Sequence, residues 1–171
     1  MGTLVKAQHL NETNSALLVA VEKSILGIKV GILTAKKSSK KKSAYIKTIL
    51  EKNIKGYTFK IEEPLSKELN DKADCVILDL KQQPLVIIEI DNMRADQVTK
   101  KLVSRLAMVA AHKNITYITI CYKSKSAKGY KEECRKYINK HIPAFLKNYK
   151  TVEYMAFLPK DSVKENKPKT K

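Results

Sequence analysis

Residues 74–91 read DCVILDLKQQPLVIIEID and contain two short apolar runs joined by a polar turn. The runs, residues 76–78 and 85–88, are rich in Val and Ile and too short for helices, which predicts two adjacent strands of a hairpin. The turn falls at residues 81–84. Because the second run is apolar on both faces, we expect a central strand that is covered on both sides.

Carboxylates lie at the ends of these two runs. Asp74 opens the first strand, and Glu89 and Asp91 close the second. Side chains two residues apart in a strand share a face, so Glu89 and Asp91 point the same way, and Asp74 can meet them across the strand pair. Unpaired carboxylates in a site of low dielectric constant are costly, and a bound cation is a common remedy. The alternative is a solvated strand end whose carboxylates pair with neighbouring lysines.

This arrangement resembles the PD-(D/E)XK nuclease superfamily, in which an Asp and a Glu on consecutive strands hold a divalent metal. Asp74 matches the Asp of that motif, Glu89 the (D/E) and Ile90 the x. Asp91 stands where the family usually has Lys, and Ala73 stands where it has Pro. The resemblance implies Mg²⁺ (or Mn²⁺) held by Asp74, Glu89 and the carbonyl of Ile90.

The same resemblance implies a metal-dependent DNA endonuclease, either a restriction enzyme or a structure-specific one, and Glu22 on the first helix would complete its metal site. Asp91 cannot donate a positive charge, so it would bind a second metal or hold the attacking water. Alternatively, a lysine of the following helix supplies the charge, with Lys101 (beside Gln97) the first choice and Lys100 the second. A one-domain nuclease that cuts both strands usually acts as a dimer, so the resemblance also allows a homodimer.

The formal net charge of +17 predicts a polyanionic partner, with nucleic acid first. Nearly all basic residues are lysines, which favours salt-sensitive contacts to the phosphate backbone over reading of bases. The lysine run within residues 36–42 is interpreted as a solvated loop that grips phosphates. We expect DNA contacts from Lys36, Lys37, Lys40, Lys41, Lys42, Arg94, Gln97 and Lys100. The alternatives are a nucleic-acid-binding protein of the same fold without catalysis, a structural or assembly protein, and a lysine-rich surface without a role.

The cysteine pattern and the hydropathy of the sequence indicate in which cellular compartment the protein is expected. Cys75, Cys121 and Cys134 are odd in number and form no CxxC motif, and the first two lie in predicted strands. Cys75 and Cys121 are expected to be buried, reduced thiols, which favours a reducing, cytoplasmic location. No apolar run is long enough to span a membrane, so no membrane partner is expected.

Hydrophobic periodicity gives the order of elements along the chain. We expect helices at residues 15–26 and 43–52, strands at 57–61, 76–78 and 85–88, a helix from about residue 96, a strand at 115–122, a helix or helix pair at 126–149 and a strand at 152–158. The helix after Asp91 should bury a stripe of apolar residues, which are Val98, Leu102, Leu106 (or, in its place, Val103) and Val109.

These elements predict a single α/β domain over residues 1–158. The strand–helix–strand unit at residues 85–122 implies a right-handed crossover and a parallel strand pair beside the antiparallel hairpin. A mixed β-sheet flanked by helices follows. The resemblance implies the restriction-endonuclease-like αβββαβ core, extended by a C-terminal helix and strand. Residues 1–14 are expected to be loose, and residues 159–171 to form a disordered basic tail.

Overall fold

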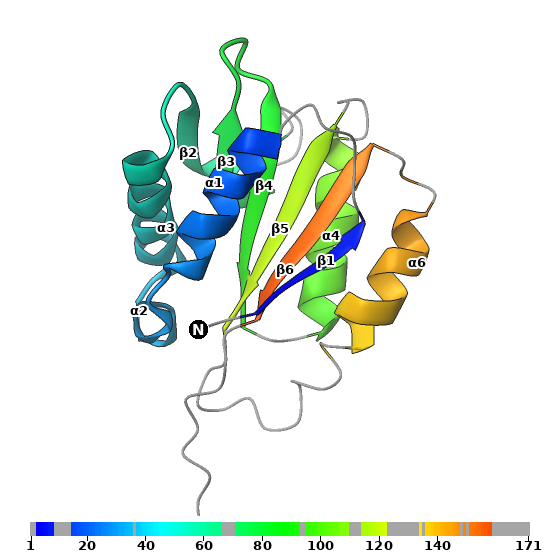
Figure 1. Cartoon of the computed structure of the whole chain (residues 1–171). Coiled ribbons are helices and arrows are strands. Elements are labelled where there is room, and N and C mark those ends of the chain that lie inside the picture. The colour runs from blue at the N-terminus through cyan, green and yellow to red at the C-terminus, as the bar shows by residue number, and fades with distance from the viewer. Residues whose placement is uncertain are drawn as a thin grey trace, which may run out of the picture.

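A six-stranded mixed sheet runs through the computed structural model of the chain, with the strands in the order β1-β6-β5-β4-β3-β2 (Figure 1). The strands are β1 (Thr3–Gln8), β2 (Thr58–Pro64), β3 (Lys72–Leu78), β4 (Pro84–Asp91), β5 (Ile115–Cys121) and β6 (Val152–Leu158). The structure describes residues 3–8, 15–35, 37–65, 71–92, 95–109, 114–122, 134, 136–147, 149 and 151–158. The predicted α/β class with a mixed sheet is confirmed.

The strand directions agree with those expected from the sequence. β2, β3 and β4 form an antiparallel meander, and the predicted hairpin pairs Cys75 with Ile88 and Ile77 with Val86. Oδ1 of Asp79 accepts the N–H groups of Lys81 and Gln83, each at 2.8 Å, which closes the turn between β3 and β4. β4, β5 and β6 are parallel, so the predicted parallel pair of β4 and β5 is confirmed.

Helices cover both faces of the sheet (Figure 1). On one face lie α1 (Ser15–Leu26), α2 (Val30–Thr34) and α3 (Ser39–Asn53), and on the other lie α4 (Ala95–Val109), the π-helical segment η2 (Tyr137–His141) and α6 (Ile142–Leu146). Side chains of β4 alternate between the two cores, so Ile88 packs under α1 and α3 while Ile87 packs under α4. The predicted stripe of α4 is buried along its whole length with Leu106 as its third member, whereas the alternative, Val103, is exposed. The thiols of Cys75 and Cys121 are buried and free, as expected.

The N-terminal segment differs from its prediction. Residues 1–14 were expected to be loose, whereas Thr3–Gln8 form β1, which pairs antiparallel with β6, Thr3 lying opposite Leu158. The prediction was wrong for these residues because a short strand of mixed composition is stabilised by its partner rather than by its own pattern. Residues 9–14 lie outside the described residues.

The lysine run is also placed differently from its prediction. The second helix was expected from Ser43, but α3 begins at Ser39, and the side chain of Ser38 accepts the N–H of Lys41 as its N-cap. Lysine is a good helix former, and the cap satisfies a backbone donor that would otherwise be unpaired, so the run starts a helix despite its like charges. The prediction of a solvated loop was therefore wrong for residues 39–42.

The C-terminal part follows the predicted helix and strand. Residues 137–146 form η2 and α6, and Pro143 lies in the first turn of α6, where its missing N–H costs little. Residues 126–133 and the predicted tail, residues 159–171, lie outside the described residues. Among the residues that are described, no helix combines the length and the apolar character needed to cross a bilayer.

Candidate active site

The three predicted carboxylates meet on the α4 side of the sheet, where β4 ends. The register that pairs Cys75 with Ile88 sets Asp74 beside Glu89 across the β3–β4 pair. Ile88 and Ile90 pack toward α1 and α3, so Glu89 and Asp91 point to the opposite face, as predicted. In open α/β sheets, the carboxyl ends of parallel strands are the usual place for ligands.

Lys101 of α4 joins the carboxylates into one cluster. Its Nζ lies 2.9 Å from Oε2 of Glu89, 3.2 Å from Oδ1 of Asp91 and 3.4 Å from Oδ2 of Asp74. Burial alone would lower the pKa of Lys101, but Asp91, Glu89 and Asp74 together raise it well above its ordinary value. The structure thus brings together all four residues that the sequence suggested as catalytic, because α4 returns over the face from which β4 presents its acids.

Asp74 is fixed from three elements of the fold. Its Oδ1 accepts hydrogen bonds from the hydroxyls of Ser39 at 2.9 Å and Ser43 at 3.4 Å, both on α3. Its Oδ2 accepts the backbone N–H of Ile90 at 2.9 Å and faces Lys101 of α4. Burial raises the pKa of Asp74, but Lys101 and the hydrogen bond from Ile90 outweigh it, so the pKa lies below its usual value. Asp74 is therefore ionised at neutral pH.

Glu89 is completely buried and is held by a residue that was not among the predicted site residues. Nε of Arg105 donates to Oε1 of Glu89 at 2.6 Å. Arg105 also pairs with Asp71 and donates to the carbonyl of Lys72 at 2.7 Å, so it ties α4 to the start of β3. The available signal was its spacing, since Arg105 is one helical turn after Lys101 and shares its face.

The pKa of Glu89 is raised to about 7, chiefly by burial. Lys101 and Arg105 lower the pKa of this carboxyl, and Asp74 raises it. Asp91 is also buried, and burial raises its pKa against the opposing effect of Lys101. The cluster therefore combines an ionised aspartate with two carboxyls that hold protons more tightly than they would in water.

The oxygen atoms of this cluster are of the kind that binds a hard divalent cation, because Mg²⁺ prefers carboxylate and carbonyl oxygens. Oδ2 of Asp91 is buried and has no hydrogen-bond partner within the described part of the chain, and the ammonium of Lys101 at 2.9 Å is the contact of Oε2 of Glu89, so both oxygens keep lone pairs for an ion. Among the described residues, however, no group of three or more His, Cys, Asp or Glu side chains is arranged to hold a metal ion as it stands. The acids instead surround the ammonium of Lys101.

The other predicted site residues are spread around this cluster. Glu22 is half-buried on α1 and takes part in none of the contacts that Asp74, Glu89, Asp91 and Lys101 make above. Gln97 is half-buried and Lys100 exposed, both on α4. Exposed side chains near the N-terminal end of α3 are those of Lys37, Lys40 and Lys41, whereas Lys42 is buried. Lys36 and Arg94 lie outside the described residues.

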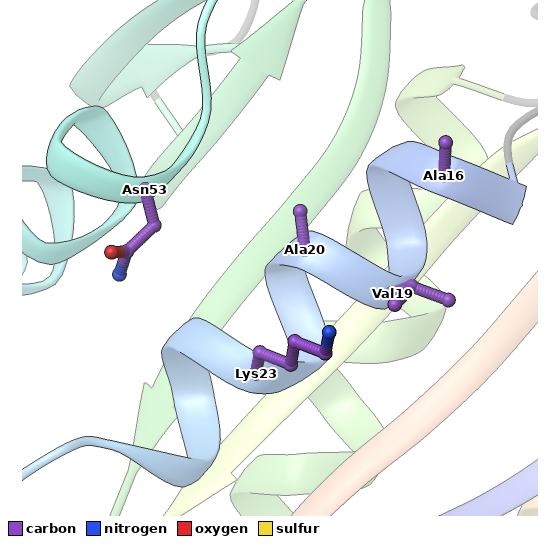
Figure 2. Close-up of a pocket in the computed structure, with 5 residues that line it drawn as sticks. All are labelled: Ala16, Val19, Ala20, Lys23 and Asn53. Carbon is purple, nitrogen blue, oxygen red and sulfur yellow. The ribbon is translucent and has the colours of Figure 1, made fainter.

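A hollow elsewhere on the surface is unrelated to the cluster. Figure 2 shows it between α1 and the C-terminal end of α3, lined by Ala16, Val19, Ala20, Lys23 and Asn53. This lining contains small apolar side chains, one lysine and one amide, and none of the predicted site residues. It therefore offers no chemistry comparable to that of the carboxylates.

Comparison of the chain with protein-family models, with curated proteins and with solved structures finds no match. The functional information therefore comes from the site itself. That site joins three acids to Lys101 and Arg105 at the end of β4 and faces the lysine-rich start of α3.

Proposed function

We propose that the protein is a metal-dependent DNA endonuclease that hydrolyses phosphodiester bonds. The observation that carries this proposal is the contact of one ammonium, that of Lys101, with Asp74, Glu89 and Asp91. Metal-dependent phosphodiester hydrolysis uses acidic ligands for the metal and is favoured by a positive charge near the reacting phosphate, and this cluster offers both. The net charge of +17 supports DNA as the substrate.

The order of elements lends support of its own. α3, β2, β3, β4, α4 and β5 follow the αβββαβ order that the resemblance to the PD-(D/E)XK superfamily implies. Under this proposal η2, α6 and β6 extend that core, and β1 adds one more strand beside β6.

Asp74, Glu89 and the carbonyl of Ile90 would hold Mg²⁺ or Mn²⁺. When bound, such an ion lowers the pKa of a water ligand and polarises the scissile phosphate. Ser39 and the N–H of Ile90 keep the Asp74 carboxylate oriented. Arg105 holds Oε1 of Glu89, so Oε2 is the oxygen that faces the site.

Lys101 supplies the positive charge that Asp91 cannot supply. Its ammonium neutralises charge on a phosphoryl oxygen, while Asp91 orients the attacking water or anchors Lys101 through Oδ1. Its side chain is 27% exposed, so the ammonium can leave at least one carboxylate and meet a substrate at the edge of the cluster. Cutting both strands of a duplex would take two copies, so a homodimer on DNA belongs to the proposal.

The test is a cleavage assay on plasmid, linear and four-way-junction DNA with Mg²⁺, Mn²⁺ or EDTA. Cleavage should require the metal and should be lost in Asp74→Asn and Glu89→Gln. Lys101→Met should slow cleavage more than it weakens DNA binding. Lys140→Met, an exposed site on η2, is the matched control and should cut like the wild type. If Lys101→Met is active and Lys100→Met is not, the charge comes from Lys100.

A second candidate is a nucleic-acid-binding protein of the same fold without catalysis. The observation that favours it is that Lys101 and Arg105 together already contact all of the clustered acids. Such a network can be purely structural, with the positive surface left to bind DNA. Wild-type protein that binds DNA equally well in EDTA, yet cuts none of the substrates with either metal, would establish this function in place of the first.

A further inference from the structure

The ammonium of Lys42 is held in an unusual environment. The residue is 9% exposed, and its Nζ lies 3.0 Å from the hydroxyl of Tyr122 and 4.2 Å from the centre of that ring. In the described part of the chain, no carboxylate lies within ion-pair distance of this Nζ. A buried charge without an opposite charge is costly, and the phenol offsets only part of that cost. This ammonium is therefore suited to bind an anion.

Lys42 is connected through its neighbours and its partner to two of the site's acids. Its neighbours on α3, Ser39 and Ser43, donate to Oδ1 of Asp74. Its partner Tyr122 donates its backbone N–H to the carbonyl of Asp91 at 2.8 Å. Tyr122 is half-buried, so the pair is at the rim of the core, where a ligand at the strand ends can reach it.

This position differs from that of Lys101. Lys42 and Tyr122 belong to the face of the sheet covered by α1 and α3, whereas Lys101 comes from α4 on the other face. A chain of phosphates that crosses the strand ends would therefore meet a lysine from each helical layer, with the acids between them. Such a chain of phosphates would also pass the first turn of α3, where the lysines and the helix dipole both contribute positive charge.

The other described lysines of the run do not share these features. Lys37, Lys40 and Lys41 are exposed, and a flexible exposed lysine attracts phosphates without fixing their position. Tyr122 restrains Lys42 before any ligand arrives, so less conformational freedom is lost on binding. A restrained ammonium can set the register of a nucleic-acid backbone, which diffuse attraction cannot do.

We propose that Lys42, positioned by Tyr122, is the fixed phosphate-binding residue of the site and binds a phosphodiester group of DNA next to the carboxylates. This inference rests on the proposed function only in taking DNA as the ligand, because binding needs neither metal nor cleavage. Lys37, Lys40 and Lys41 then supply long-range attraction.

The test measures the binding of a short fluorescent DNA duplex by anisotropy in EDTA, over a series of salt concentrations. Lys42→Met keeps the aliphatic volume and removes the charge, and it should weaken binding about tenfold and reduce the salt slope by about one. Lys41→Met, one position away and exposed, should weaken binding less than about threefold. Lys52→Met, near the other end of α3, is the neutral control and should bind like the wild type.

Thermal unfolding of the free proteins separates a ligand-binding role from a structural one. Lys42→Met should melt at the wild-type temperature or higher, because it removes a buried charge. Tyr122→Phe keeps the ring but frees the ammonium, so it should also weaken binding more than Lys41→Met does. Equal losses for Lys42→Met and Lys41→Met, or a lower melting temperature of Lys42→Met with unchanged affinity, overturn the inference. A wild type that does not bind DNA overturns both the proposed function and this inference, whereas wild-type binding that Lys42→Met leaves unchanged overturns the inference alone.

Discussion

Arg105 donates from Nε to Oε1 of Glu89 at 2.6 Å, and both side chains are buried. Breaking a buried ion pair from one side leaves the other charge without compensation. Arg105→Met should therefore lower the free energy of unfolding by about 3 kcal/mol, as measured by urea titration at neutral pH. Lys140→Met, which removes an exposed charge, is the control. A loss no larger than that of the control would show that Lys101 alone compensates Glu89.

The raised pKa of Glu89 predicts how stability changes with pH. This pKa goes from 4.5 to about 7 on folding, so between these values the native state holds a proton that the unfolded state has released. The contribution of Glu89 to stability is thus fully present below pH 4.5 and falls as the pH rises toward 7. In EDTA, the free energy of unfolding of the wild type minus that of Glu89→Gln should fall by about 1.4 kcal/mol per pH unit in this window. A difference that stays flat from about pH 5 to pH 7 contradicts the raised pKa.

The ammonium of Lys101 occupies the space among the carboxylates, so it should compete with divalent cations. Lys101→Met should bind Mg²⁺ or Mn²⁺ at least about tenfold more tightly than the wild type does in the absence of DNA, by calorimetric titration. Asp74→Asn should bind these ions more weakly, because a carboxylate ligand is lost. Unchanged metal affinity in Lys101→Met would mean that the acids do not form the metal site.

Binding to DNA should depend steeply on salt, because phosphate contacts release counterions. Replacing Lys37, Lys40 and Lys41 together with alanine should weaken binding about equally for duplexes of different sequence and flatten the salt dependence. These substitutions spare Ser39 and Lys42, which make contacts inside the fold, so the helix should remain intact. Melting curves check that. An affinity that stays constant across the salt series would exclude backbone binding by these lysines.

Much of the site could be predicted from local rules. The alternation of a strand puts Glu89 and Asp91 on one face, and the parallel crossover returns α4 over that face, so Lys101 could be placed near the acids from the sequence alone. The ion pair between Arg105 and Glu89 could not be predicted, because it depends on how α4 is rotated about its own axis relative to the sheet. The burial of Lys42 depends on Tyr122, which is 80 residues away in the chain. A lysine run on its own is typical of a solvated surface, and nothing near it in sequence indicates such a partner.

The pairing of β1 with β6 is a late step in the formation of the sheet. Thr3 lies opposite Leu158, so the first strand of the sheet can pair only after β6 has been synthesised. Contacts so far apart in sequence are the slowest to form, because a long loop must close before they are made. Until β1 has paired, β6 is the edge strand of the sheet and offers its unpaired backbone groups to any other extended chain. Newly made copies should therefore be most prone to aggregate during this interval, and a protein that lacks residues 1–8 should remain in that vulnerable form.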